Sequence, residues 1–270
     1  MKSVEEFYNN FDKKLIDDYV FGNKRLESAI VKFASFISEK SENILDIGCG
    51  LGWSSHEFAK HFDNANIEGI DLSPILLETA NKLFHNNNLS YKVIDITQNL
   101  PDTLYDAVVM IDVYEHIQIS DRPKFHEALK AVIKDQGRLI LACPSKYHQE
   151  YLKKNNPNGL QPIDEDVDSE SFNRLAKDIE GELIFLEYQN IWRNLDYVYC
   201  VIERKPIYGS ESAIKNSGIL VLESKKSRVE RVKRKLKTEY PKPPKTTWFF
   251  PFKKVVKRGL RKCYRYIKNK

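Results

Sequence analysis

Three glycines at alternate positions, Gly48, Gly50 and Gly52, follow an apolar stretch that contains Asp46. Glycine is needed where the backbone takes a positive φ, or where a ligand approaches the main chain without a Cβ in the way. A carboxylate beside such a turn, together with the turn carbonyls, can accept hydrogen bonds from an ammonium group. The D-x-G-x-G-x-G pattern therefore favours a cofactor that has an amino-acid moiety and no pyrophosphate.

Two other glycine motifs fit this stretch poorly. A dinucleotide-binding GxGxxG motif needs glycine or alanine three residues after its second glycine, and this chain has Trp53 there. A phosphate-binding loop needs GK[ST], which the stretch does not contain. The four cysteines are widely separated and show no metal-ligand spacing, so we expect no metal site. They are Cys49, Cys143, Cys200 and Cys263.

The glycine turn lies in a chain whose apolar runs alternate with amphipathic, helix-like segments. The runs predict strands at 43–47, 67–71, 90–94, 106–111 and 138–142, and the segments between them predict helices at 53–62, 74–85 and 122–134. Strands separated by helices pair in parallel, so we expect an α/β fold with a doubly wound, mostly parallel, seven-stranded sheet. Two closely spaced runs, 181–192 and 195–204, predict an antiparallel hairpin at its edge. Ligands of such sheets bind at the carboxyl edge, where the glycine turn falls.

Three segments resemble one known family. LDIGCGLG at 45–52, YDAVVMIDVYEHI at 105–117 and GRLILACPS at 137–145 are similar to segments of the class I S-adenosylmethionine (SAM) dependent methyltransferases. The resemblance is strongest to the small-molecule methyltransferases of the ubiquinone and menaquinone biosynthesis type, and it covers residues 40 to 145. It implies a Rossmann-like fold, methyl transfer and SAM as the cofactor.

The resemblance also implies which residues contact SAM. Asp71 would take the ribose hydroxyls, and Asp95 would meet the adenine amino group while Ile96 packs on the ring. An alternative for Asp71 is a helix cap, because Ser73 and Pro74 follow it. The full set expected at the cofactor is Asp46, Gly48, Cys49, Gly50, Gly52, Asp71, Leu72, Asp95, Ile96, Asp112 and Val113.

His116 is the candidate general base. It lies in the loop after the fourth strand, which borders the methyl group in the resembling enzymes, and histidine titrates near neutral pH. A structural role for Glu115 and His116 is the alternative. Tyr147 and His148 follow the fifth strand and could contact the acceptor, or could simply begin a lid.

The charge of the chain is unevenly distributed. Residues 225–270 carry 19 Lys and Arg against two acidic residues, a net +17, which leaves −12 on the rest of a chain whose net charge is +5. Read as helices, 227–240 and 252–268 have apolar stripes flanked by cations, which suits an anionic membrane surface. A nucleic-acid-binding arm is the main alternative, and the regular stripe favours the membrane.

These patterns predict a helical cap at 1–40, a methyltransferase domain at 41–208 with an irregular loop or lid at 143–170, a linker at 209–224 and a basic amphipathic tail at 225–270. No long apolar run or export signal is found, so we expect a cytoplasmic protein, peripheral on the inner membrane face. The hypothesis is methylation of a hydroxyl on a lipid-linked glycan, quinone precursor or other membrane-associated metabolite. The alternatives are an RNA methyltransferase and a SAM-binding scaffold without catalysis.

Overall fold

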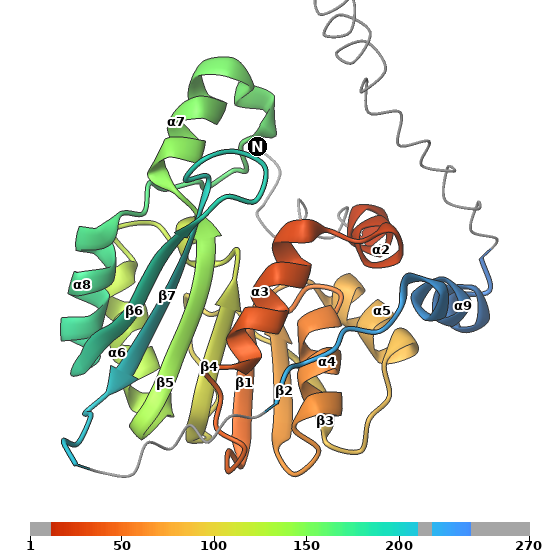
Figure 1. Ribbon diagram of the computed structural model, residues 1–270, viewed down its shortest axis with the longest axis horizontal. Coiled ribbons are helices and arrows are strands. Elements are labelled where there is room, and N and C mark those ends of the chain that lie inside the picture. Colours follow the sequence, from red (N-terminus) through yellow and green to blue (C-terminus); the bar gives the residue numbers. More distant parts are fainter. Residues whose placement is uncertain (1–11, 210–217, 239–270) are drawn as a thin grey trace, which may run out of the picture. The chain divides into compact units, whose positions relative to one another are not determined.

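A computed structural model of the chain describes residues 12–209 and 218–238. The expected apolar stripe at 252–268 lies outside the described residues. Within them, the compact unit contains one seven-stranded sheet with helices on both faces (Figure 1).

The sheet has the order β3-β2-β1-β4-β5-β7-β6. Its first five strands pair in parallel, whereas β7 is antiparallel to both β5 and β6. The α/β fold, the seven strands and the antiparallel hairpin are therefore confirmed. The strands are β1 Asn43–Ile47, β2 Asn66–Asp71, β3 Leu89–Val93, β4 Tyr105–Ile111, β5 Ile133–Pro144, β6 Gly181–Gln189 and β7 Tyr197–Arg204.

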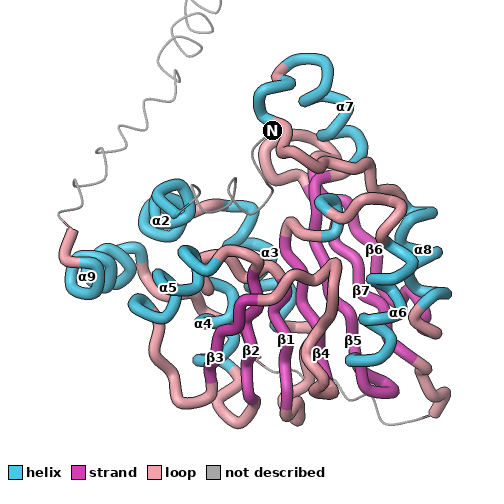
Figure 2. Tube along the Cα trace, turned by 180° about the vertical axis from the view of Figure 1, so that it is seen from behind, coloured by secondary structure: helices cyan, strands magenta, loops and turns pink. Residues whose placement is uncertain are grey.

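Helices cover both faces of this sheet, and Figures 1 and 2 view it from opposite sides. The helices α3 and α4 lie over the face seen in Figure 1, and α6 lies over the face seen in Figure 2. Buried side chains of α6 and α8 share one apolar core with those of β4, β5 and β7. The bounds are α3 Lys24–Ala34, α4 Trp53–His61, α5 Pro74–Leu83, α6 Arg122–Val132 and α8 Ser169–Asp178, with a short 3-10 helix η1 at Tyr114–His116.

The N-terminal cap is a pair of short helices. Helix α2, Asp12–Phe21, is followed by Gly22 at φ +88°, and Asn23 then caps α3 by accepting a hydrogen bond from the Arg25 amide. A glycine with positive φ followed by an Asn cap both ends one helix and starts the next. Gly22 and Asn23 therefore form the bend between α2 and α3.

The segment 143–170 is more regular than we expected. It contains helix α7, Lys146–Asn155, and a 3-10 turn η2, Pro157–Gly159. Ser145 caps α7 by accepting a hydrogen bond from the His148 amide, and Pro157 follows its end. The expectation of an irregular loop was therefore wrong for the first half of the segment, because a good cap outweighed the prolines and glycine on either side.

The basic segment after residue 218 also differs from the expected organisation. Helix α9, Lys225–Leu236, packs against α2 and α5, and the compact unit extends to Thr238. Val232, expected on a membrane-facing stripe, is fully buried, and Leu220 ahead of the helix is also buried. The division expected at residue 225 is therefore misplaced, because the apolar side of α9 packs against protein. No described helix is long and apolar enough to cross a bilayer.

Candidate functional site

The glycine turn joins β1 to α4 at the carboxyl edge of the sheet. The amides of Gly48 and Cys49 both donate to the Ile70 carbonyl, at 2.8 and 3.0 Å, which ties the turn to β2. Gly48 has φ +67°, and a Cβ there would overlap the Val113 side chain. Gly50 has φ +53°, and a Cβ there would lie 3.2 Å from Leu15 of α2. The turn is therefore closely covered at both glycines, and both positions have the left-handed backbone that favours glycine.

Gly52 leaves room for a side chain of a neighbouring strand. Its φ is +80°, and a Cβ there would overlap the Tyr91 ring, whose hydroxyl donates to the Gly52 carbonyl at 3.2 Å. Gly52 lines neither of the two cavities described below. It therefore allows Tyr91 of β3 to pack against the turn, and its place at the cofactor stays a prediction.

Asp46 is buried under the turn. Its carboxylate accepts hydrogen bonds from the hydroxyls of Ser54 and Ser55, at 2.6 and 2.5 Å. Burial raises the pKa of Asp46 to about 6, although the two serine hydrogen bonds oppose the rise. The carboxylate is therefore ionised at neutral pH but titrates much closer to neutrality than an exposed aspartate.

Asp71 ends β2 and links two loops. It accepts hydrogen bonds from the Gly50 amide at 2.8 Å and from the Ser73 amide at 2.9 Å. Ser73, not Asp71, is the N-cap of α5, since its hydroxyl accepts from the Leu76 amide. Burial raises the pKa of Asp71. The cap alternative for Asp71 is thereby set aside, and its carboxylate instead holds the glycine turn beside the end of β2.

Two adjoining cavities open at this edge. The smaller, about 150 Å³, lies between the glycine turn and the N-terminal helices, and the larger, about 340 Å³, lies beside the ends of β2, β3 and β4. Asp46, Cys49 and Gly50 line the smaller cavity. The larger is lined by Leu72, Asp95, Ile96 and Val113, among others. Both are lined by Gly48, Asp71, Asp112 and His116.

Asp95 is held in place by Thr97, two residues further along the chain. Its Oδ1 accepts hydrogen bonds from the Thr97 amide at 2.9 Å and from the Thr97 hydroxyl at 2.7 Å. Ile96 is partly buried and packs against the apolar core on one side while lining the larger cavity on the other. The pair therefore presents one carboxylate and one apolar surface to that cavity.

A charged cluster lies where the two cavities meet. Asp112 follows β4 with φ +58°, and its Oδ2 lies 2.8 Å from Nη2 of Arg25 on α3. Burial raises the pKa of Asp112 although Arg25 opposes the rise, and burial together with the charge of Asp112 raises the pKa of Glu115 well above its usual range. Oδ1 of Asp112 and both carboxyl oxygens of Glu115 are buried without a hydrogen-bond partner. The cluster therefore holds more carboxyl groups than cations.

His116 lies on η1 beside this cluster. Its Nδ1 donates to the Ile163 carbonyl at 2.6 Å, and Oδ1 of Asp164 lies 3.4 Å from the same nitrogen. The amide of Glu165 donates to the Glu115 carbonyl at 2.8 Å. The second half of segment 143–170 is thus tied to the loop after β4 and fixes how the His116 ring is oriented.

The other two candidates lie elsewhere. Tyr147 and His148 belong to the first turn of α7, and neither lines either of these cavities. Tyr147 is 46% exposed and its ring lies 6.0 Å from that of Tyr188, while burial lowers the pKa of His148 beside Trp192. The structure does not bring either residue to the glycine turn.

Sequence reasoning missed the residues that approach the turn from distant parts of the chain. Arg25, Lys14 and Leu15 of the N-terminal helices line the smaller cavity, and Ile163 lines the larger one. No local motif marks them. The described residues contain no group of three or more His, Cys, Asp or Glu side chains that could hold a metal ion.

Comparisons with known proteins find methyltransferases that are similar to this chain. Residues 44–137 match a family model described as a methyltransferase domain. The chain is 27% identical over 219 residues to malonyl-[acyl-carrier protein] O-methyltransferase 2 of Ilyobacter polytropus, covering 77% of this chain and 81% of that protein. It is 29% identical over 119 residues to a ubiquinone biosynthesis O-methyltransferase of Coxiella burnetii, covering 43% of this chain and about half, 49%, of that protein.

A solved structure shares the fold. The magnesium protoporphyrin IX methyltransferase of Synechocystis PCC 6803, determined with bound S-adenosylhomocysteine (SAH), superposes with a TM-score of 0.58 at 16% identity. The match covers 73% of this chain and 98% of that one. At this identity the likeness concerns the fold.

Proposed function

Because this chain is a class I SAM-dependent methyltransferase, we propose that it methylates an oxygen atom of a small, membrane-associated acceptor, with His116 as the general base. The observation that carries the proposal is the position of His116, which lines both cavities at their junction. Both relatives reported above are named as O-methyltransferases, which supports an oxygen nucleophile.

The residues around the turn fit SAM. The larger cavity offers apolar Leu72, Ile96 and Val113 to the adenine, with the Asp95 carboxylate beside them for its amino group. Asp71 would take the ribose hydroxyls, because a carboxylate can accept two hydrogen bonds side by side. When bound, SAM supplies a methyl group on a positively charged sulfur, which is the electrophile of the reaction.

The smaller cavity fits the amino-acid end of the cofactor. Asp46 and the turn carbonyls would accept hydrogen bonds from its ammonium group, and Arg25 would attract its carboxylate. The buried, unpartnered Oδ1 of Asp112 marks a place where a hydrogen-bond donor is needed. Each polar group of the amino acid then has a partner of opposite charge in the chain.

The proposed base acts through Nε2 of His116. The Ile163 carbonyl keeps the proton on Nδ1, so the lone pair of the neutral imidazole is on Nε2. A hydroxyl acceptor hydrogen-bonded to Nε2 would lose its proton to it as the oxygen attacks. Asp164, 3.4 Å from Nδ1, would stabilise the imidazolium that forms.

Variants of His116 test this assignment. We expect His116→Asn to retain SAH binding within about threefold and to lower methyl transfer at least 100-fold, in line with the usual contribution of general acid–base catalysis. His148→Asn is the matched control, since His148 lies at the same sheet edge but lines neither cavity. Full transfer by His116→Asn would overturn the role of His116.

The acceptor is tested with SAM labelled in its methyl group. Label should pass to the lipid or small-molecule fraction of a cell extract and should resist release by mild base, because a methylated hydroxyl is an ether. Label in the RNA fraction would instead support an RNA methyltransferase. SAH binding without label in any fraction would support a scaffold without catalysis.

The membrane part of the proposal is supported by the charge of the C-terminal region. On α9 the side chains of Lys226, Arg234 and Lys235 are exposed, while the buried side of the helix packs against the domain. Each cation near an anionic surface contributes about 1 kcal/mol. We expect the full chain to sediment with vesicles containing phosphatidylglycerol and not with pure phosphatidylcholine, and a triple Glu variant at these positions to bind less. Equal binding to both vesicles would overturn an electrostatic attachment.

A further inference from the structure

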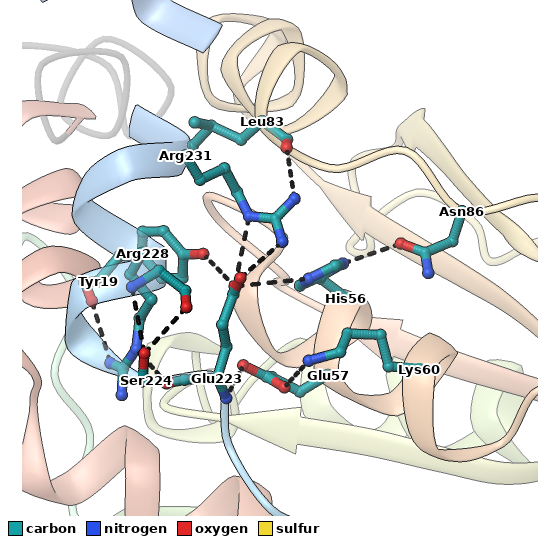
Figure 3. A network of polar contacts seen from close by, with 12 residues as sticks. Tyr19, His56, Glu57, Lys60, Leu83, Asn86, Glu223, Ser224, Arg228 and Arg231 are labelled. Carbon is teal, nitrogen blue, oxygen red and sulfur yellow. Dashed lines mark hydrogen bonds and ion pairs between the residues drawn. The ribbon is translucent and has the colours of Figure 1, made fainter. Parts of the chain in front are cut away.

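The segment 218–236, here called the C-terminal strap, returns across the domain to the N-terminal cap. It comprises residues 218–224 and helix α9, and α9 lies beside α2 and α5 (Figures 1 and 2). Nothing in the methyl-transfer site described above requires it. Three of its polar side chains, Glu223, Arg228 and Arg231, nevertheless point into the domain, where they meet groups of α2, α4 and α5 (Figure 3).

Arg228 is the most deeply buried cation of the strap, with 3% of the residue exposed. Its Nη1 donates to the Tyr19 carbonyl at 3.0 Å, its Nη2 to the Glu27 carboxylate at 2.7 Å and its Nε to the Glu223 carbonyl at 2.9 Å. The guanidinium also lies 4.7 Å from the centre of the Trp53 ring. One side chain therefore joins the strap to α2, to α3 and to the first residue of α4.

Glu223 is a second junction of the strap. Its carboxylate accepts hydrogen bonds from the Tyr19 hydroxyl at 3.0 Å and from Arg231 at 2.8 Å, and His56 Nε2 lies 3.9 Å away (Figure 3). Its amide donates to the Glu57 carboxylate at 3.1 Å. The strap is thus held to α4 as well as to α2, by partners that are mostly buried.

The strap holds two parts of the chain that lie beside the glycine turn, helix α2 and Trp53. Leu15 of α2 lies against Gly50, and Trp53 lines the smaller cavity. Tyr19 packs edge to face on Trp53 with ring centres 5.4 Å apart. A ten-residue helix such as α2 is marginal in isolation and takes its stability from tertiary packing. The position of α2 over the turn therefore depends on what packs behind it.

We propose that Arg228 is a positioning residue for the cofactor: by bonding to Tyr19 and Glu27 and stacking on Trp53, it fixes the cap over the glycine turn and so sets the affinity for SAM and SAH. Arg228 does not touch either cavity and acts only through α2, α3 and Trp53. The C-terminal strap then supports the binding site without lining it. Chemistry at the acceptor plays no part in this role.

The test is calorimetric titration of the full chain with SAH, well below its melting temperature. We expect Arg228→Ala to weaken SAH binding at least tenfold, Arg228→Lys to recover part of the loss, and Arg234→Ala, at an exposed arginine of the same helix, to bind as the wild type does. A folded Arg228→Ala with wild-type affinity would overturn the proposal, even if its melting temperature were lower.

Hydrogen exchange separates positioning from general stability. SAH should protect the amides of 12–21 in the wild type, and this protection should be lost in Arg228→Ala while that of β1 and β4 amides remains. Should Arg228→Ala fail to fold, Glu27→Gln removes one partner of the same network and should weaken SAH binding by a smaller factor; no change would overturn the proposal. SAH binding does not involve His116 as a base, so failure of the proposed function would leave these results unaffected.

Discussion

The guanidinium of Arg25 and the carboxylate of Asp112 form a 2.8 Å ion pair between the N-terminal cap and the carboxyl end of β4. The side chains are only 24% and 15% exposed, and Asp112 is held at φ +58°. Both residues line the smaller cavity, and Asp112 also lines the larger one. The pair is therefore the first target for mutation.

Removing Arg25 should damage both stability and cofactor binding. Arg25→Ala removes the ion-pair partner of Asp112 and a cation close to Glu115, so we expect the free energy of unfolding to fall by about 1–3 kcal/mol. SAH binding should weaken about tenfold. Chemical denaturation and calorimetry measure the two effects. The double variant Arg25→Ala/Asp112→Asn should recover part of the lost stability, because the unpaired carboxylate is removed. A double variant less stable than Arg25→Ala would mean that the loss does not come from an unpaired Asp112.

Gly48→Ala should weaken SAH binding by more than the strained backbone angle alone would. A left-handed residue other than glycine costs about 1 kcal/mol, and here the new methyl would also overlap Val113. Gly209→Ala is the matched control, since Gly209 has φ +76° and open space around it. We expect Gly48→Ala to bind SAH at least tenfold more weakly and Gly209→Ala to bind normally. Equal binding by both variants would contradict the close packing at Gly48.

Asp71→Ala should weaken SAH binding by tenfold or more, because the variant would lose the charge-assisted hydrogen bonds that we propose between Asp71 and the ribose. It also releases the amides of Gly50 and Ser73. The control is Ser73→Ala, which removes the N-cap of α5 and should cost about 1 kcal/mol of stability without changing affinity. If Asp71→Ala behaves as Ser73→Ala does, Asp71 has only a structural role.

His56 should make the protein less stable in mild acid. Burial and the nearby Arg231 lower the pKa of His56 to about 4, whereas the unfolded chain titrates near 6.5. Between these values the unfolded state binds more protons, so the free energy of unfolding falls as the pH falls from about 6.5 to 4, by up to about 3 kcal/mol. Denaturation at several pH values should show this fall in the wild type and a smaller one in His56→Gln.

Asp46 should change the free energy of unfolding in the opposite direction over the same pH range. Its pKa is raised to about 6, so its contribution to stability is present at low pH and is lost as the pH rises from about 4 through 6. Asp46→Asn should therefore steepen the acid loss that His56→Gln reduces. If the wild type and His56→Gln differ in free energy of unfolding by the same amount at every pH, the pKa of His56 is not lowered.

Local sequence determined the sheet and the glycine turn. The predicted strand at 43–47 coincides with β1, and the alternation of apolar runs with amphipathic segments gave the parallel core because each element is encoded by its own periodicity. The expected cofactor residues, apart from Gly52, all line at least one of the two cavities, because each lies at or close to the carboxyl end of a strand and parallel strands end at one edge.

Tertiary structure decided which distant side chains meet there. The Tyr91 ring packs where Gly52 has no side chain, Arg25 forms an ion pair with Asp112, and the Ile163 carbonyl orients His116. In each pair the two residues are far apart in the sequence. The basic helix α9 looked like a surface-binding tail, yet its apolar side and Arg228 are buried against α2 and α4. A local pattern specifies that a helix has an apolar face, but what covers that face depends on contacts between residues far apart in the chain.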